Sequence, residues 1–291
     1  MQTLIRQIRA NLDLSQKEFA ELLGVSFVTV NRWENGWSIP TPLAEERIHM
    51  IGRDHRVPVY EQILARIRHI ADETTLPSDR LLLYHGSKAG IEGAVKPISR
   101  PQCDFGRGFY MGDDVSQVLT LICDYDQSKL YLTSVDLSGL ETIDVPSNLD
   151  WALLVACHRG KMESIRGTKL YEKYRAMTAG KDLVIGNIAD DRMFYVIDNF
   201  FAGNITDAAL VSSLSALQLG RQYVAVSERG CKAVRIEREI EISNLERLFI
   251  RDAAEENRAK GIALATAICR DHRREGLYFD EILENTQRKE G

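Results

Sequence analysis

Two segments of the sequence combine residue types that suit the binding of a flat, polar ligand. The first is His85-Gly86-Ser87, which follows the apolar residues 81–84. An apolar run of this length bounded by Gly and Ser predicts a buried strand. A His at the end of such a strand, followed at once by Gly, lies where a ligand can approach the main chain closely.

The second segment, residues 104–113, surrounds Arg107 with two glycines and follows them with two aromatic residues. This pattern suits a flat ring that stacks on an aromatic side chain beside exposed main-chain amides. Either segment alone is better explained by a core histidine or a glycine-rich turn. Both segments together, in this order and at this spacing, favour a binding site.

The combination of His-Gly-Ser with Phe-Gly-x-Gly-Phe-Tyr resembles the nicotinamide clamp of the ADP-ribosyltransferase superfamily. The branch is the His-Tyr-Glu type, to which poly(ADP-ribose) polymerases and diphtheria toxin belong. The resemblance covers about residues 81–230 and extends to a bacterial family of unknown function in that clan, commonly found near or fused to helix-turn-helix modules. It implies NAD as a substrate and no metal.

The resemblance also implies a role for each residue of the two motifs. His85 would orient a ribose hydroxyl, the main chain of Gly86 would pair with the nicotinamide carboxamide, and Tyr110 would stack on the ring. The other residues implied to surround NAD are Tyr84, Ser87, Arg107, Gly108 and Phe109. The second stacking tyrosine of the polymerases is missing near Leu121, so the site is more open or Tyr125 substitutes.

A third element should carry a carboxylate near the ribose, because breaking the nicotinamide bond leaves an oxocarbenium-like sugar. In the resembling register, residues 220–227, Gln222 stands where the polymerases have their catalytic Glu. A Gln can bond ribose hydroxyls but supplies no negative charge, a loss on the order of a few kcal/mol of barrier. The rival carboxylate, Glu228, shares the strand face but lies roughly 20 Å away if the strand continues.

Periodicity predicts the elements that carry these motifs. After the second motif, helices are expected at residues 115–119, 149–158, 194–197 and 206–217, and strands at residues 130–137, 181–185 and 220–227. The strand at 181–185 should break at Gly186 and lead to Asp190-Asp191. Adjacent acids can do acid–base work or bind a metal, but after a strand they more often cap a helix. Charged, helix-like segments then predict a tail, at residues 236–249, 253–269 and 276–283.

The first 50 residues predict three short helices. Apolar residues at helical spacing place the first helix at 3–11. Ser15 and Glu18 form a capping box for a second helix, 16–23, which Gly24 ends. Ser26 then caps a third helix that reaches Asn35. Two short helices joined through glycine are a helix-turn-helix.

Residues 3–49 resemble the Cro/repressor (XRE) family, from Leu14-Ser15-Gln16 to Trp33-Glu34-Asn35-Gly36 and Pro40. The resemblance implies that the third helix enters the major groove of DNA. The residues implied to contact DNA are Gln16, at a phosphate, and Phe27, Val28, Asn31 and Arg32, at base edges. Basic and acidic side chains balance in residues 1–56, so counterion release is small and tight binding needs a homodimer. A bundle that docks a protein partner is the alternative.

The fold class expected from these elements is α+β. An all-α helix-turn-helix domain (1–56) and a helical connector (57–80) precede an ADP-ribosyltransferase-like split β-sheet domain (81–235) and a helical tail (236–291). In the connector, apolar residues from Pro58 to Ile70 predict one amphipathic helix.

The 291 residues are 44% apolar and carry a net charge of −5, so nucleic acid must bind through a local patch. The chain lacks an apolar run of membrane-spanning length and a signal-peptide pattern, and its five cysteines are scattered, which together predict a cytoplasmic protein. Three hypotheses follow. They are a DNA-binding ADP-ribosyltransferase with a toxin, defence or stress role, a regulator that binds NAD or ADP-ribose without catalysis, and a plain interaction protein.

Overall fold

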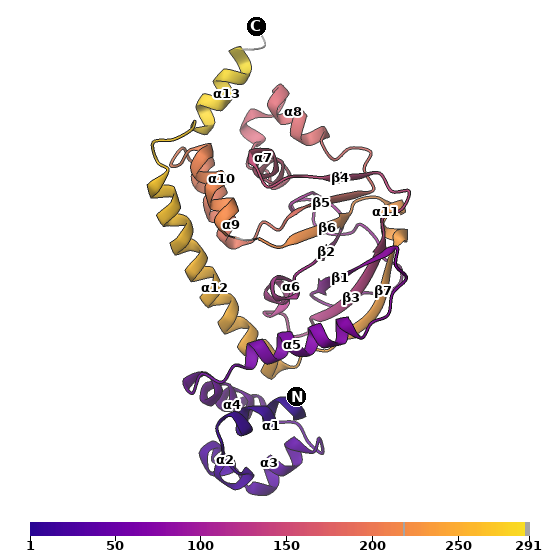
Figure 1. Ribbon diagram of the computed structural model, residues 1–291, viewed down its shortest axis with the longest axis vertical. Helices are drawn as coiled ribbons and strands as arrows, with labels where there is room; N and C mark the ends of the chain where they lie inside the picture. Colours follow the sequence, from indigo (N-terminus) through magenta and orange to yellow (C-terminus); the bar gives the residue numbers. More distant parts are fainter. Residues whose placement is uncertain (218, 289–291) are drawn as a thin grey trace.

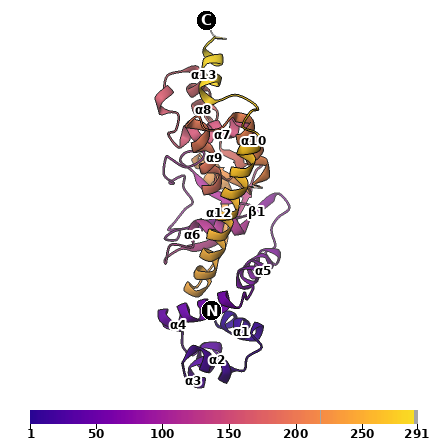
Figure 2. The ribbon, with the colours of Figure 1, turned by 90° about the vertical axis from the view of Figure 1, so that its left-hand side faces the viewer.

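The computed structural model describes residues 1–217 and 219–288. A group of short helices forms one end of the molecule, and a seven-stranded sheet flanked by helices forms the larger part (Figure 1). The side view shows an elongated outline, with α13 (Phe279–Arg288) at the end opposite the N-terminal helices (Figure 2). The α+β class and the order of helix-turn-helix, sheet domain and helical tail are confirmed.

Local capping defines the N-terminal helices, as the sequence predicts. Ser15 accepts a hydrogen bond from the Glu18 amide, and the Glu18 carboxylate accepts one from the Ser15 amide. Gly24 ends the helix with a φ of 67°, a conformation that glycine adopts without a Cβ penalty. The four helices of this region are α1 (Gln2–Asn11), α2 (Gln16–Leu23), α3 (Phe27–Glu34) and α4 (Pro42–Asp54).

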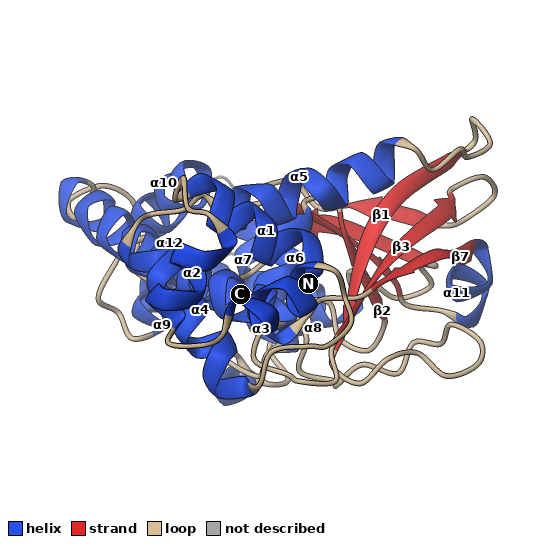
Figure 3. Ribbon diagram, turned by 90° about the horizontal axis from the view of Figure 1, so that it is seen from below, coloured by secondary structure: helices blue, strands red, loops and turns tan. Residues whose placement is uncertain are grey.

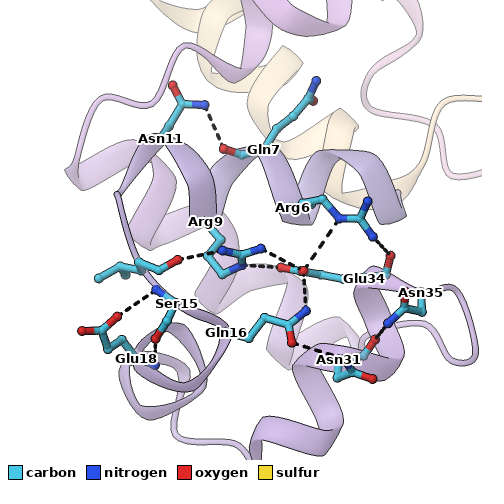
Figure 4. Close-up of polar contacts among 11 residues, drawn as sticks. Arg6, Gln7, Arg9, Asn11, Ser15, Gln16, Glu18, Asn31, Glu34 and Asn35 are labelled. Atoms are coloured by element: carbon cyan, nitrogen blue, oxygen red, sulfur yellow. Dashed lines mark hydrogen bonds and ion pairs between the residues drawn. The ribbon is translucent and has the colours of Figure 1, made fainter.

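A buried carboxylate holds these helices together (Figure 4). Glu34, at the end of α3, is 2% exposed and accepts hydrogen bonds from Arg9 Nε at 2.6 Å and from Gln16 Nε2 at 2.7 Å. Gln16 Oε1 in turn accepts a bond from Asn31 Nδ2 at 3.2 Å. Burial alone would raise the pKa of Glu34, but the bonds from Arg9 and Gln16 hold it below its ordinary value.

The helix-turn-helix region packs directly on the rest of the chain. Its helix α4 lies against α12 (Asn244–Asp271), where His49 Nε2 is 2.7 Å from Asp252 Oδ2. A Cβ at Gly52 would lie 2.8 Å from the Phe249 ring, so the two helices are in close contact. Helix α5 (Val59–Asp72) also packs on α12, and one apolar core continues from α1 through α5 to the sheet.

The sheet has the strand order β4-β5-β6-β2-β1-β3-β7, and only β4 and β5 are parallel neighbours. In the view from below, most helices gather on one side and the strands on the other (Figure 3). The strands are β1 (Arg80–Ser87), β2 (Phe109–Gly112), β3 (Lys129–Asp136), β4 (Thr142–Asp144), β5 (Leu183–Asn187), β6 (Arg221–Ala225) and β7 (Val234–Ile240).

Helices cover the sheet and complete the core. Helix α7 is buried at all but its first two residues and packs on α8 and α10. No helix in the described residues is long and apolar enough to cross a membrane. The helices between the strands are α6 (Val115–Ile122), α7 (Leu149–His158), the 3-10 turn η1 (Glu163–Ile165), α8 (Lys169–Ala176), α9 (Asp191–Phe201), α10 (Asp207–Ala216) and α11 (Glu228–Ala233).

Three expectations about these elements were wrong. The segment after Val234 begins with the edge strand β7, not a helix, and the helix that follows, α12, is continuous over 28 residues. Gly186 lies inside β5, where a Cβ would meet Phe105 at 2.8 Å, so it permits close packing and breaks no strand. By contrast, the His-Gly-Ser motif forms the end of β1, in agreement with the expected strand end. Among the paired acids, Asp190 is the N-cap of α9, as favoured above.

Replacing Glu34 by Gln tests the buried network. The change leaves the Arg9 guanidinium without its charged partner, and we expect a loss of about 3 kcal/mol in unfolding free energy at pH 7. Because the folded-state pKa of Glu34 is lowered, its contribution is present above the unfolded pKa and disappears as pH falls through the folded pKa. Urea titrations at pH 7 and pH 3.5 should therefore give a smaller difference at the lower pH. Exposed Glu46→Gln on α4 is the matched control, and equal effects of the two changes would contradict the prediction.

Candidate functional site

Strands β1 and β2, at the centre of the sheet, stop pairing where the His-Gly-Ser motif begins. Strand β1 pairs with β3 along its whole length, from Arg80 to Ser87. It pairs with β2 only at Tyr84, opposite Gly112. The two central strands therefore separate at His85, and the last three residues of β1 lie beyond the β1–β2 ladder.

The His85 side chain spans this separation. Its Nδ1 lies 2.6 Å from the main-chain oxygen of Tyr110. A carbonyl oxygen only accepts, so Nδ1 carries the hydrogen and Nε2 keeps a lone pair. The Phe109 ring stacks on the imidazole, with centroids 4.1 Å apart. Burial lowers the pKa of His85 to about 4, so the ring is neutral at pH 7 and Nε2 is an acceptor.

The Tyr110 phenol lies on the opposite face of the sheet from His85 and Phe109, because neighbouring side chains alternate along a strand. Its hydroxyl donates to the Gly106 carbonyl at 2.7 Å and accepts from the Phe105 amide at 3.0 Å. Burial, with Asp104 nearby, raises its pKa. The phenol is thus bound to the loop before β2, and Tyr110 contacts His85 only through its backbone.

Gln222 lies on β6, on the same face as Tyr110, and is 5% exposed. Its Nε2 donates to Asp104 Oδ2 at 2.8 Å and to the Asn187 carbonyl at 2.7 Å. Both partners are acceptors, which fixes the orientation of the amide. The Oε1 atom accepts no hydrogen bond from any residue in the described ranges.

Asp104 is a member of this site that sequence reasoning missed. Its carboxylate is buried and receives hydrogen bonds from Arg159 Nη2 at 2.7 Å, the Ala189 amide at 3.0 Å and Gln222. A Glu at position 222 would place a second carboxylate beside Asp104. The Gln is therefore the residue that the fold requires there. The only sequence signal was the place of Asp104 at the start of the second motif.

The remaining motif residues shape the backbone around this site. A Cβ at Gly86 would lie 2.7 Å from Ile122 on α6, and one at Gly108 would lie 2.4 Å from Val224. Both positions therefore require glycine. Ser87 Oγ donates to the Gly90 carbonyl at 2.7 Å, which closes the turn after β1.

Of the other expected residues, Tyr84 precedes the first motif, Arg107 lies within the second, and Tyr125 and Glu228 are the alternatives left open above. Tyr84 is buried in the core shared with α6, and Arg107 is exposed. Just after β1, the Lys88 ammonium lies 4.0 Å from the ring centroid of half-exposed Tyr125, so this aromatic does reach the end of the motif. Glu228 begins helix α11 and is exposed, so the strand does not continue to it.

The expected DNA-reading residues lie on the first turns of α3 and beside it. Phe27 and Val28 are 50% and 56% exposed, and Arg32 is also exposed. Asn31 and Gln16 are joined by the hydrogen bond described above and belong to the Glu34 network. Figure 4 shows the two side chains bonded to each other between α2 and α3, so the network fixes their mutual arrangement.

Comparison with known proteins matches two parts of the chain to family models. Residues 81–236 match the family described as protein of unknown function (DUF3990), and residues 5–44 match the helix-turn-helix family. The second match supports the expectation that the N-terminal domain binds DNA. No curated protein and no solved structure matches the chain.

Replacing Gln222 by Glu should destabilise the protein. Two buried carboxylates would then face each other, and we expect a loss of about 3 kcal/mol in unfolding free energy at pH 8. The Asp104 carboxyl and the new carboxyl would share one proton, with a raised pKa. The free energy of unfolding should therefore be higher at pH 5, where the pair is protonated, and should fall as pH rises. Urea unfolding at both pH values measures this. Gln102→Glu, on an exposed loop, is the control. A Gln222→Glu variant as stable as wild type at pH 8 would refute the role assigned to Asp104.

Proposed function

The chain belongs to the DUF3990 family, and we propose that its sheet domain is an NAD-dependent ADP-ribosyltransferase carried by a homodimeric DNA-binding module. The observation that supports this most is the separation of β1 from β2 at His85. It leaves a neutral imidazole, a glycine main chain and a hydroxyl-bearing turn together at a break in the sheet. These are the groups that a ribose and a carboxamide would use.

The proposed reaction breaks the bond between nicotinamide and its ribose, and nicotinamide leaves with the bonding electrons. A nucleophile on the acceptor attacks the ribose carbon and loses its proton. His85 Nε2 would accept a hydrogen bond from a ribose hydroxyl, and the Gly86 main chain would hold the carboxamide. Tyr125, beside Lys88, is placed to stack on the nicotinamide ring.

The Gln222 side chain lies on the opposite face of the sheet from the His85 imidazole, so positive charge at the ribose carbon would be met by neutral groups beside His85 rather than by a charged group. The nearest carboxylate in this network, Asp104, is already neutralised by Arg159. Preorganised dipoles stabilise charge less than a carboxylate does, so we expect slow turnover.

One observation favours a second function, in which the sheet domain binds NAD or ADP-ribose without catalysis. Both amide hydrogens of Gln222 and the hydroxyl of Tyr110 are already bonded within the protein. Gln222 and Tyr110, two of the three expected catalytic residues, therefore use their donor groups to hold the fold and not to bind a substrate. In this reading, nucleotide binding regulates the DNA-binding domain.

Nicotinamide release from NAD by the purified protein separates the two functions. We expect slow release by wild type and a decrease of at least about a hundredfold in His85→Ala, because the ribose loses its positioning group. His69→Ala, on the exposed face of α5, is the matched control. NAD binding, measured by calorimetry, without release in wild type would support the regulator. Neither binding nor release would exclude both functions.

DNA binding is tested at Arg32. Its side chain is exposed on α3, and a bidentate contact with guanine is worth about 1–3 kcal/mol. Arg32→Ala should therefore weaken binding to the protein's own promoter by tenfold or more, as measured by fluorescence anisotropy at fixed salt. Arg53→Ala, an exposed arginine on α4, should have little effect. Equal losses in both variants would indicate general charge attraction instead of base reading.

A further inference from the structure

A pocket of about 380 Å³ lies beside the loop that holds Tyr110. Its lining includes Phe105 and Gly106 of that loop, His158 at the end of α7, and four residues in and after α8, namely Arg175, Thr178, Gly180 and Lys181. The pocket is on the face of the sheet that carries Tyr110, opposite the face of the His85 imidazole.

His158 is unsatisfied in this pocket. The residue is 9% exposed, and neither ring nitrogen has a hydrogen-bond partner among the described residues. A neutral imidazole has one donor and one acceptor to satisfy, and leaving both unmade when buried is unfavourable. A Cβ at Gly106 would lie 3.0 Å from Nδ1, so the ring is closely packed at that nitrogen. Both nitrogens are shielded from solvent at the buried end of the pocket, and a polar ligand that reached them would supply the missing bonds.

The rim of the pocket is cationic. Arg107 and Arg175 are exposed, and neither forms a hydrogen bond or ion pair with any residue in the described part of the chain. Lys181 lies 3.8 Å from Glu141, which is its one carboxylate neighbour. Three cationic residues therefore line one cavity, and the residues that line it include no Asp or Glu, in a protein whose net charge is −5.

We propose that this pocket binds the phosphate group of a small ligand, at a site separate from the proposed NAD site. Guanidinium groups match phosphate oxygens in a bidentate way, and the imidazole N–H adds a donor at the buried end. A carboxylate carries one negative charge and a phosphate dianion carries two. Three cationic side chains therefore match the charge of a phosphate dianion better than that of a carboxylate. The volume leaves room for a small group attached to the phosphate.

Calorimetric titration of the full chain with inorganic phosphate and with AMP tests this proposal. We expect wild type to bind, Arg175→Gln to bind at least tenfold more weakly, and His85→Ala to bind as wild type. Arg166→Gln, which removes an exposed charge in the same region away from the pocket, is the matched control and should also bind as wild type. Tighter binding of AMP would identify a nucleotide phosphate as the ligand, and equal binding would identify free phosphate.

A second variant tests the buried end of the site. His158→Leu removes the unpaired ring nitrogens, so we expect a higher Tm than wild type without phosphate and no rise of Tm when phosphate is added. Absence of phosphate and AMP binding in wild type would overturn the proposal, as would unchanged affinity in Arg175→Gln. Displacement of bound phosphate by NAD in wild type would overturn the claim that the two sites are separate.

Discussion

The buried carboxylate of Asp104 joins four parts of the sheet domain. It accepts hydrogen bonds from Arg159 after α7, from the amide of Ala189 after β5 and from Gln222 on β6, and it stands in the loop that leads into β2. A carboxylate buried this deeply is tolerated only when its oxygens are bonded. The interaction therefore dictates an amide at position 222. It also holds the loop whose main chain binds the Tyr110 hydroxyl. The residue type at position 222 and the position of the loop before β2 both depend on this one negative charge.

The contrast between Glu34 and Asp104 shows where sequence reasoning succeeds. Around Glu34, the helices could be predicted because their caps are local: Ser15 and Glu18 are three residues apart, and Gly24 follows directly. Asp104 and Gln222 are 118 residues apart, and no local pattern connects them. The motif that contains His85 was recognisable as a strand end with a glycine. That Phe109, not Tyr110, stacks on His85 follows only from strand register.

The error at residues 236–249 has a physical cause. Strand β7 reads Val-Arg-Ile-Glu-Arg-Glu-Ile, and its charged residues suit an exposed helix as well as a sheet edge. The pairing with β3 decides between them, and it includes an irregularity at Leu132/Thr133. Charged side chains along an edge also hinder pairing with another chain. The long helix α12 was divided in two because its apolar face changes partners along its length, from α4 and α5 to α9 and α10.

Helix α12 limits how far the sheet domain can move relative to the helix-turn-helix region when that region is bound to a duplex. Tandem modules joined by a flexible tether sample a sphere whose radius grows with tether length. Here α4 and α5 pack against α12, the same continuous helix that packs against α9 and α10. His49 and Asp252 are in contact at one end of it. The sheet domain is therefore presented at one orientation relative to the bound groove. Its position around any duplex that the helix-turn-helix holds is thus set by the fold and not by the length of a tether.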